Sequence, residues 1–222
     1  MTQEESIAKI LLDAKAVKVS VNPPFTWNTG FLAPIYCDNR LLISYPEERG
    51  LVIKGFKDLI EQNNLEFDVL AGTATAGIPW ASFLAQELNK AMVYVRAQPK
   101  DYGKAKQVEG FMPNGARVLI VEDLISTGRS SLTSAKACQR EYEAQIVAVI
   151  AIFDYQMELA KTSFADANIN LLALSNFSSL VKVAAEQSYL TKEEKDNALS
   201  WGANPEAWHK AHGGKEILKV VK

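Results

Sequence analysis

Two adjacent acidic residues, Glu122 and Asp123, are followed closely by small polar residues at 126–128 in the stretch RVLIVEDLISTGRS. The backbone N–H groups of a turn that opens a helix point outward, and such a turn suits a phosphate. Carboxylates at the end of a strand would lie at the sheet edge where open α/β proteins bind ligands. From these residues alone a second explanation stays open, because Asp123 or Ser126 could simply cap the following helix.

The elements on either side of this stretch would position its side chains. Residues 118–121 are a continuous apolar run that is too short for a helix core, so we expect a strand buried on both faces of a parallel sheet. That strand is predicted to stop before Glu122. Residues 130–142 have apolar residues at helical spacing, which predicts a helix directly after the polar turn.

A second turn of small residues, GTATAGIP at 72–79, lies between a predicted strand that includes residues 67–70 and a predicted helix at 78–88. Its two glycines allow either a close approach to an anion or a strained backbone conformation. The glycine spacing matches the first half of a nucleotide-binding Walker loop. Ile78 and Pro79, however, stand where that loop requires Lys and Ser or Thr, which excludes an NTPase of this class.

A cationic segment, RAQPKDYGKAKQVEG at 96–110, follows a predicted strand at 92–95. Few apolar residues tether it, so it is expected to be mobile. One explanation is an ordinary solvated loop. The other is a cationic flap that closes over a bound anion and excludes water.

The other segments predict how the chain is organised. Helical spacing predicts an N-terminal helix over residues 3–16 and another that begins at Pro46. Residues 25–40 mix aromatics, prolines and charges, and on composition they suit an edge hairpin over the core. From residue 67 to residue 174 strands alternate with helices, which predicts a mainly parallel sheet covered on both faces. The closing helices, with a capping box at Thr191 and Glu194, are interpreted as structural.

Composition limits the classes of function. The chain has 222 residues, 48% of them apolar, which is enough for a substantial core. A net charge of -2 argues against a general nucleic-acid or membrane-surface binder, so small ligands are the expected partners. Cys37 and Cys138 lie far apart and indicate neither a disulfide framework nor a zinc cluster, which fits a reducing cytoplasm. His209 and His212 have no acidic or cysteine residue beside them, so no protein metal site is predicted.

Taken together, the ordered motifs resemble the type I phosphoribosyltransferases, and the string PIYCDNR at 34–40 resembles the orotate phosphoribosyltransferases in particular. The resemblance implies an α/β fold with a mainly parallel central sheet flanked by helices, as one domain over residues 1–222 with a small hood at 1–45. It also implies that orotate reacts with phosphoribosyl pyrophosphate, giving orotidine 5-monophosphate and pyrophosphate in pyrimidine synthesis.

The resemblance implies roles for individual residues. The two acids would hold the ribose 2- and 3-hydroxyls, since carboxylates accept hydrogen bonds from hydroxyls and are poor neighbours for phosphate. Catalytic and pyrophosphate-binding roles fall on Arg96, Lys100 and Tyr102. Substrate-binding roles fall on Tyr36, Thr73, Thr75, Glu122, Asp123, Leu124, Ile125, Ser126, Thr127, Gly128, Arg129 and Ser130. Within this set Ser126 would also contact orotate, and Tyr36 would stack against its ring.

Several positions depart from the family pattern. Tyr102 replaces a histidine that is usual in relatives, Ala76 stands where some have lysine, and Arg129 stands where a small residue is common. The resemblance further implies Mg²⁺ between the pyrophosphate oxygens and a homodimer in which the flap reaches the neighbouring site. Two other functions stay open, namely a phosphoribosyltransferase for another base, which would not explain PIYCDNR, and a nucleotide-sensing regulator without turnover.

Overall fold

The computed structural model describes residues 1–99 and 106–215. The chain divides into two compact units, one of Met1–Leu41 with Ser175–Lys222 and one of Leu42–Leu174, and each is described by itself. Lys100 and Tyr102 of the predicted flap lie outside the described residues. The assignment of residues 1–222 to a single domain with a hood at 1–45 stays a prediction.

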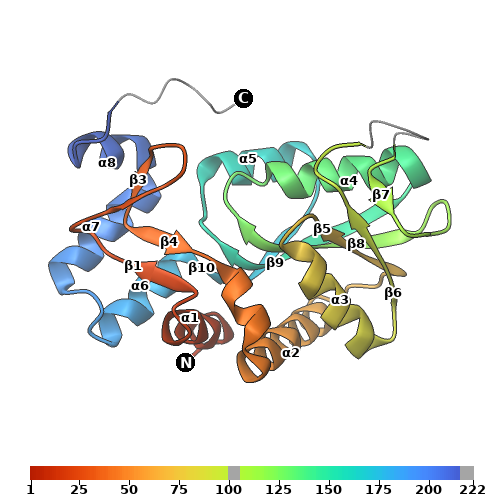
Figure 1. Cartoon of the computed structure of the whole chain (residues 1–222), viewed down its shortest axis with the longest axis horizontal. Coiled ribbons are helices and arrows are strands. Elements are labelled where there is room, and N and C mark those ends of the chain that lie inside the picture. Colours follow the sequence, from red (N-terminus) through yellow and green to blue (C-terminus); the bar gives the residue numbers. More distant parts are fainter. Residues whose placement is uncertain (100–105, 216–222) are drawn as a thin grey trace. The chain divides into compact units, whose positions relative to one another are not determined.

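A mostly parallel sheet forms the centre of the unit Leu42–Leu174, in the strand order β10-β9-β8-β5-β6-β7 (Figure 1). Strand β5 pairs in parallel with β6 and β8, and β8 pairs in parallel with β9, while β7 is antiparallel to β6. The predicted α/β class with a mainly parallel sheet is confirmed. The strands are β5 (Val69–Thr73), β6 (Ala91–Val95), β7 (Val108–Glu109), β8 (Arg117–Ile125), β9 (Gln145–Asp154) and β10 (Leu171–Asn176).

Helices cover this sheet from two sides. Figure 1 shows α4 and α5 on one side of the strands and α2 and α3 on the other. The four apolar residues at 118–121 are completely buried, as expected for a strand covered on both faces. Cys138 of α4 packs in the same core, and burial raises the pKa of its thiol to about 12. The helices are α2 (Pro46–Gln62), α3 (Gly77–Leu88), α4 (Arg129–Tyr142) and α5 (Glu158–Asp166).

Strand β8 is longer than the sequence predicted. Its pairing with β5 ends where Gly72 faces Val121, but its pairing with β9 continues until Ile125 faces Asp154. The predicted stop before Glu122 is therefore wrong, because β9 continues to supply backbone partners after the apolar run ends. Consequently, the acid pair lies on a part of β8 that extends beyond its pairing with β5.

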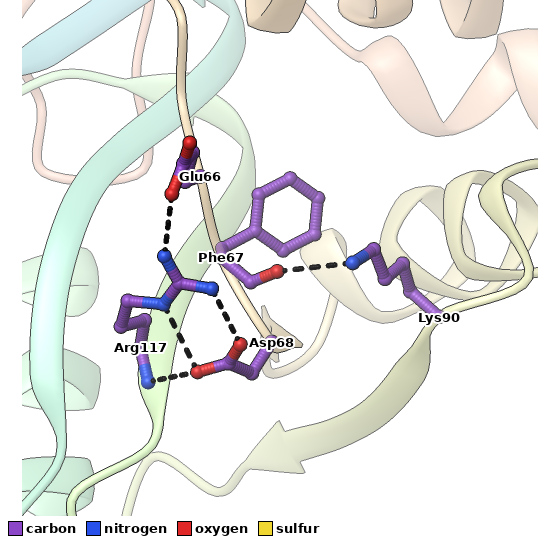
Figure 2. A network of polar contacts seen from close by, with 5 residues as sticks. All are labelled: Glu66, Phe67, Asp68, Lys90 and Arg117. Atoms are coloured by element: carbon purple, nitrogen blue, oxygen red, sulfur yellow. Dashed lines mark hydrogen bonds and ion pairs between the residues drawn. The ribbon is translucent and has the colours of Figure 1, made fainter.

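An ionic network ties β5 to β8 at the opposite, amino-terminal edge of the sheet (Figure 2). The guanidinium of Arg117 contacts Asp68 Oδ1 and Glu66 Oε2, each at 2.8 Å, and the backbone N–H of Arg117 donates to Asp68 Oδ2 at 2.9 Å. Arg117 lowers the pKa of the Asp68 carboxyl to about 2. Lys90 donates to the Phe67 carbonyl at 3.2 Å. These contacts fix the register of the strands at the edge away from the acid pair.

The other unit combines short strands with helices from both ends of the chain. Helix α1 (Gln3–Asp13) ends earlier than predicted, because Ala14 is its C-cap and Lys15 takes a left-handed φ of 56°. The segment 25–40 forms β2 (Phe25–Thr26) and β3 (Leu32–Ala33), which pair as a hairpin, and β4 (Ile35–Cys37), which pairs with β1 (Val17–Val19). The 3-10 helix η1 (Asn39–Ser44) follows.

The closing helices of this unit are α6 (Phe177–Glu186), α7 (Lys192–Ala203) and α8 (Pro205–Ala211). The predicted capping box of α7 is confirmed. His209 accepts a hydrogen bond from Leu32 N at 2.9 Å and stacks on Phe31, whereas His212 stacks on Trp208. Both histidines therefore take part in packing. In residues 1–99 and 106–215, no helix is long and apolar enough to span a membrane.

Candidate active site

The acid pair lies where β8 extends beyond β5, and Glu122 points toward the start of α4. Its side chain is almost fully buried, with 4% of the residue exposed. Its Oε2 atom accepts hydrogen bonds from Ser130 Oγ at 2.9 Å and from Ser131 Oγ at 3.2 Å. Asp123 is half-buried, and its backbone N–H donates to Glu122 Oε1 at 3.2 Å. The two acids therefore differ, with Glu122 anchored to the helix start and Asp123 more open to solvent.

Burial changes the acidity of Glu122. Loss of solvent and, second, the neighbouring charge of Asp123 raise the pKa of its carboxyl, while the Ser130 hydroxyl and the Asp123 N–H lower it, and the net result is a pKa of about 8. Without ligand, Glu122 is therefore mostly protonated at neutral pH. Donor groups such as sugar hydroxyls would favour its ionised form.

Folding stability is expected to fall as the pH rises from about 4.5 to about 8, because the folded state holds the Glu122 proton across this window and the unfolded chain has released it. The maximum slope is about 1.4 kcal/mol per pH unit. Urea unfolding of the wild type and of Glu122→Gln at several pH values would measure it. Glu122→Gln is the reference for the wild type, since it lacks the titrating group. Parallel pH profiles for the two proteins would contradict the assignment.

The turn after the acid pair opens α4. Gly128 has a left-handed φ of 75°, and a Cβ atom there would lie 2.5 Å from Phe164 Cε2, so only glycine fits. The Leu132 N–H makes a helical hydrogen bond to the Gly128 carbonyl at 3.0 Å. The N–H groups before Leu132 belong to the first turn, which has no intrahelical acceptors for them. This geometry suits an anion at the start of α4.

The turn between β5 and α3 lies against β8. A Cβ atom at Gly77 would be 2.3 Å from the Val121 carbonyl oxygen, and one at Gly72 would be 2.9 Å from Ile78 Cα. Neither glycine has a positive φ, so a strained backbone conformation is the wrong explanation for them. They allow backbone segments to pack closely. In the pairing of β5 with β8, Gly72 faces Val121, so the next residue, Thr73, follows at the level of the acid pair.

The two threonines of this turn differ in exposure. Thr73 is buried, and its Oγ1 atom has no hydrogen-bond partner among the described residues. Thr75 is exposed, and the peptide bond between Ala74 and Thr75 is cis. A buried hydroxyl without a protein partner is uncommon and is consistent with a place for a ligand atom.

Arg96 lies directly after β6, on the opposite side of β5 from the acid pair. Its side chain is partly exposed, and Nη1 lies 3.6 Å from Glu109 Oε1. Its backbone N–H donates to the Gln107 carbonyl at 3.0 Å. The carboxyl ends of three neighbouring strands, β8, β5 and β6, thus carry the acid pair, Thr73 and Arg96.

The remaining predicted residues have different surroundings. In the segment after the acid pair, Ile125 is buried and its carbonyl accepts from Tyr155 N, while Ser126 Oγ lies 3.5 Å from Met157 Sδ. Leu124 and Thr127 are half-buried, and Arg129 and Ser130 are exposed. Tyr36 belongs to the other unit and is 42% exposed.

The sequence motifs did not predict three neighbours of the site, namely Ser131, Met157 and Phe164. Ser131 contacts Glu122, Met157 contacts Ser126, and Phe164 lies beside Gly128. The serine pair at 130–131 was a usable signal, because neighbouring hydroxyls at a helix start can both face one carboxylate. Met157 and Phe164 come from a distant segment, and nothing in the local pattern links them to the turn.

A family model described as the phosphoribosyl transferase domain matches residues 46–186. An orotate phosphoribosyltransferase of Coxiella burnetii is 50% identical over 208 residues, which cover 94% of this chain and 99% of that protein. The chain belongs to the orotate phosphoribosyltransferase family. This family membership agrees with an acid pair and a helix-opening turn at the carboxyl edge of the sheet.

This phosphoribosyltransferase has the same fold as several solved structures. The UMP synthase of Leishmania donovani matches with a TM-score of 0.74 at 25% identity, covering 90% of this chain but only 42% of that longer chain. The orotate phosphoribosyltransferase of Aeropyrum pernix matches with a TM-score of 0.68 at 24% identity, covering 83% of this chain and 99% of that one. The predicted type I phosphoribosyltransferase fold is confirmed.

Proposed function

We propose that this phosphoribosyltransferase transfers the phosphoribosyl group of phosphoribosyl pyrophosphate to orotate, giving orotidine 5-monophosphate and pyrophosphate in pyrimidine biosynthesis. The observation that carries the proposal is the 50% identity to an orotate phosphoribosyltransferase along nearly the whole chain. The acid pair beside the start of α4 supports it, because one edge of the sheet then carries carboxylates that accept hydrogen bonds from hydroxyls and N–H groups that donate to phosphate.

In the proposed reaction the bond between the anomeric carbon and the pyrophosphate oxygen breaks, and orotate's ring nitrogen forms the new bond to that carbon. Positive charge develops on the sugar as the leaving group departs, so stabilising separated charges matters more than activating the nucleophile. Orotate's ring nitrogen is already acidic and needs no strong general base. Glu122 and Asp123 would hold the ribose hydroxyls, and residues 126–130 would hold the 5-phosphate.

The pyrophosphate would be bound on the other side of β5. Arg96, Lys100 and Tyr102 are assigned to it by the family resemblance, together with the hydroxyls of Thr73 and Thr75. The buried Thr73 hydroxyl, which has no hydrogen-bond partner within the described part of the chain, supports this assignment, since a ligand oxygen would satisfy it. A phenol at position 102 can still donate a hydrogen bond to a phosphate oxygen.

We propose that a magnesium ion takes part and is held mainly by the substrate. Among the described residues, no three His, Cys, Asp or Glu side chains form a group that could hold a metal. Mg²⁺ commonly keeps several waters and binds through substrate phosphates, so the pyrophosphate oxygens would be its principal ligands. When bound, it would offset the negative charge of the leaving group.

We also propose a cytoplasmic homodimer in which the flap reaches the neighbouring subunit's site.

The experiment that tests this function follows the absorbance of orotate with purified protein. Consumption should require both phosphoribosyl pyrophosphate and Mg²⁺, and uracil or adenine in place of orotate should give no product. Activity on another base but not on orotate would replace the proposal with a different phosphoribosyltransferase. Binding of the nucleotide without any turnover would identify a regulator instead.

Lys100→Ala is expected to lower kcat about 10²-fold, because a cation that meets developing charge on the leaving group is lost. The KM values should change much less, since the lysine would act mainly in the transition state. Steady-state kinetics with both substrates measures the effect, and Lys192→Ala, at an exposed lysine on α7, is the control. Unchanged turnover would remove Lys100 from the catalytic role.

A further inference from the structure

We propose that Glu141, near the end of α4, is a positioning residue for Arg96 and acts on it through Gln107. The proposal rests on the proposed function, in which Arg96 binds pyrophosphate. Glu141 itself would not touch the substrate. It would fix the backbone from which the Arg96 side chain extends.

Glu141 binds the backbone at the beginning of β7. Its Oε1 atom accepts from Gln107 N at 2.9 Å and its Oε2 atom accepts from Val108 N at 3.1 Å. The side chain is only 8% exposed. Burial alone would raise the pKa of Glu141, but the two N–H groups and Arg140 together hold it below its usual value. The carboxylate thus stays ionised while it holds two consecutive backbone N–H groups.

Gln107 connects Glu141 to Arg96 through hydrogen bonds. The Gln107 carbonyl accepts from Arg96 N at 3.0 Å, and Gln107 Nε2 donates to the Arg96 carbonyl at 3.1 Å. Gln107 is 4% exposed, and its Oε1 atom accepts from Arg140 Nη2 at 2.8 Å. Both backbone groups of Arg96 are therefore bound by a single buried residue, which is itself bound by α4.

Strand β7 needs this support because it is an edge strand of two residues. So short a pairing is weak by itself. The last turn of α4 adds further contacts, with Lys106 Nζ 4.5 Å from the centre of the Tyr142 ring and Tyr142 Oη donating to the Gly110 carbonyl at 3.4 Å. Glu109, within β7, lies 3.6 Å from the Arg96 guanidinium. A shift of β7 would therefore move both the backbone and the ionic partner of Arg96.

The arrangement gives α4 a role at each end in the proposed reaction. Its first turn would bind the 5-phosphate, and its last turn sets the position of Arg96 at the pyrophosphate. Loss of the Glu141 anchor should therefore weaken the use of phosphoribosyl pyrophosphate and leave orotate binding unchanged.

The test compares Glu141→Gln with the wild type. An amide keeps one acceptor oxygen but turns an NH₂ group toward a backbone N–H, so kcat/KM for phosphoribosyl pyrophosphate should fall about tenfold. The KM for orotate should change by less than about twofold. Gln107→Met, which removes the bond to the Arg96 carbonyl and keeps the side-chain volume, should give the same selective loss. Glu61→Gln, at an exposed position of α2, is the matched control.

A double-mutant cycle with Arg96→Ala separates positioning from general support of the fold. If Glu141 acts through Arg96, adding Glu141→Gln to Arg96→Ala should lower kcat/KM for phosphoribosyl pyrophosphate only slightly further. Equal losses of kcat/KM for both substrates, or additive losses of kcat/KM from the two substitutions in the cycle, would overturn the inference. If Arg96→Ala itself leaves the KM for phosphoribosyl pyrophosphate unchanged, the assignment of Arg96 in the proposed function fails instead. A selective effect of Arg96→Ala without one of Glu141→Gln would refute the positioning role alone.

Discussion

The double variant Glu122→Gln/Asp123→Asn is expected to lower kcat/KM for phosphoribosyl pyrophosphate by about 10³-fold, without a loss of folding stability at neutral pH. Both carboxylates would accept hydrogen bonds from the ribose hydroxyls, and charged acceptors form stronger hydrogen bonds than amides do. The negative charge also lies beside the sugar on which positive charge develops. The amides would lose both effects and keep the shape of the site.

The stability expectation follows from the surroundings of Glu122. Its raised pKa, about 8, means that the ligand-free protein already holds a neutral group there at neutral pH, which glutamine resembles. Glutamate ionises in the unfolded chain at neutral pH and glutamine does not, so thermal unfolding should give the variant a midpoint at least as high as that of the wild type. Orotate consumption measures the activity. Glu158→Gln/Asp166→Asn, which changes two exposed acids on α5, is a control for net charge.

Retained activity in the acid-pair variant would remove these carboxylates from sugar binding and with them the central element of the proposed site. Lost activity together with lost folding would have a different meaning. The acids would then be structural, and a phosphoribosyl pyrophosphate binding measurement at low temperature would show whether the folded fraction still takes the ligand.

Gly77→Ala is expected to destabilise the protein by about 3 kcal/mol, because the added methyl group would overlap the Val121 carbonyl oxygen. The clash distance is 2.3 Å, and the clashing atom belongs to the backbone of a buried strand, which cannot rotate away as a side chain would. Relief requires α3 to move away from β8. The turn with Thr73 would then move from the acid pair, so activity should fall as well.

Urea unfolding of Gly77→Ala and of Gly50→Ala tests this expectation. Gly50 lies within α2, and a Cβ atom there meets nothing within 4 Å, so alanine should be neutral or stabilise the helix by up to about 1 kcal/mol. An equal change in the free energy of unfolding for the two variants would show that close packing at Gly77 does not contribute specifically to stability.

Local patterns were sufficient for part of the fold and of the site. The apolar run at 118–121, Pro46 and the Thr191 capping box were readable because each depends on its neighbours in the sequence. The end of β8 was not readable, since the pairing beyond Val121 is supplied by β9, far along the chain. Likewise, the links from Glu141 to Gln107 and from Ser126 to Met157 join residues about 30 positions apart, and composition carries no signal for them.

The proposed phosphate turn is built largely from main chain, and this has a consequence for the evolution of the family. Side chains at positions such as Leu124, Thr127 and Arg129 can be exchanged without removing any N–H group. Gly128 is the exception, since its left-handed φ and the adjacent Phe164 ring leave no room for a side chain. Descendants of one ancestor can therefore inherit the phosphate site intact and diverge in the substituents around it, which makes this scaffold readily adaptable to new acceptor molecules.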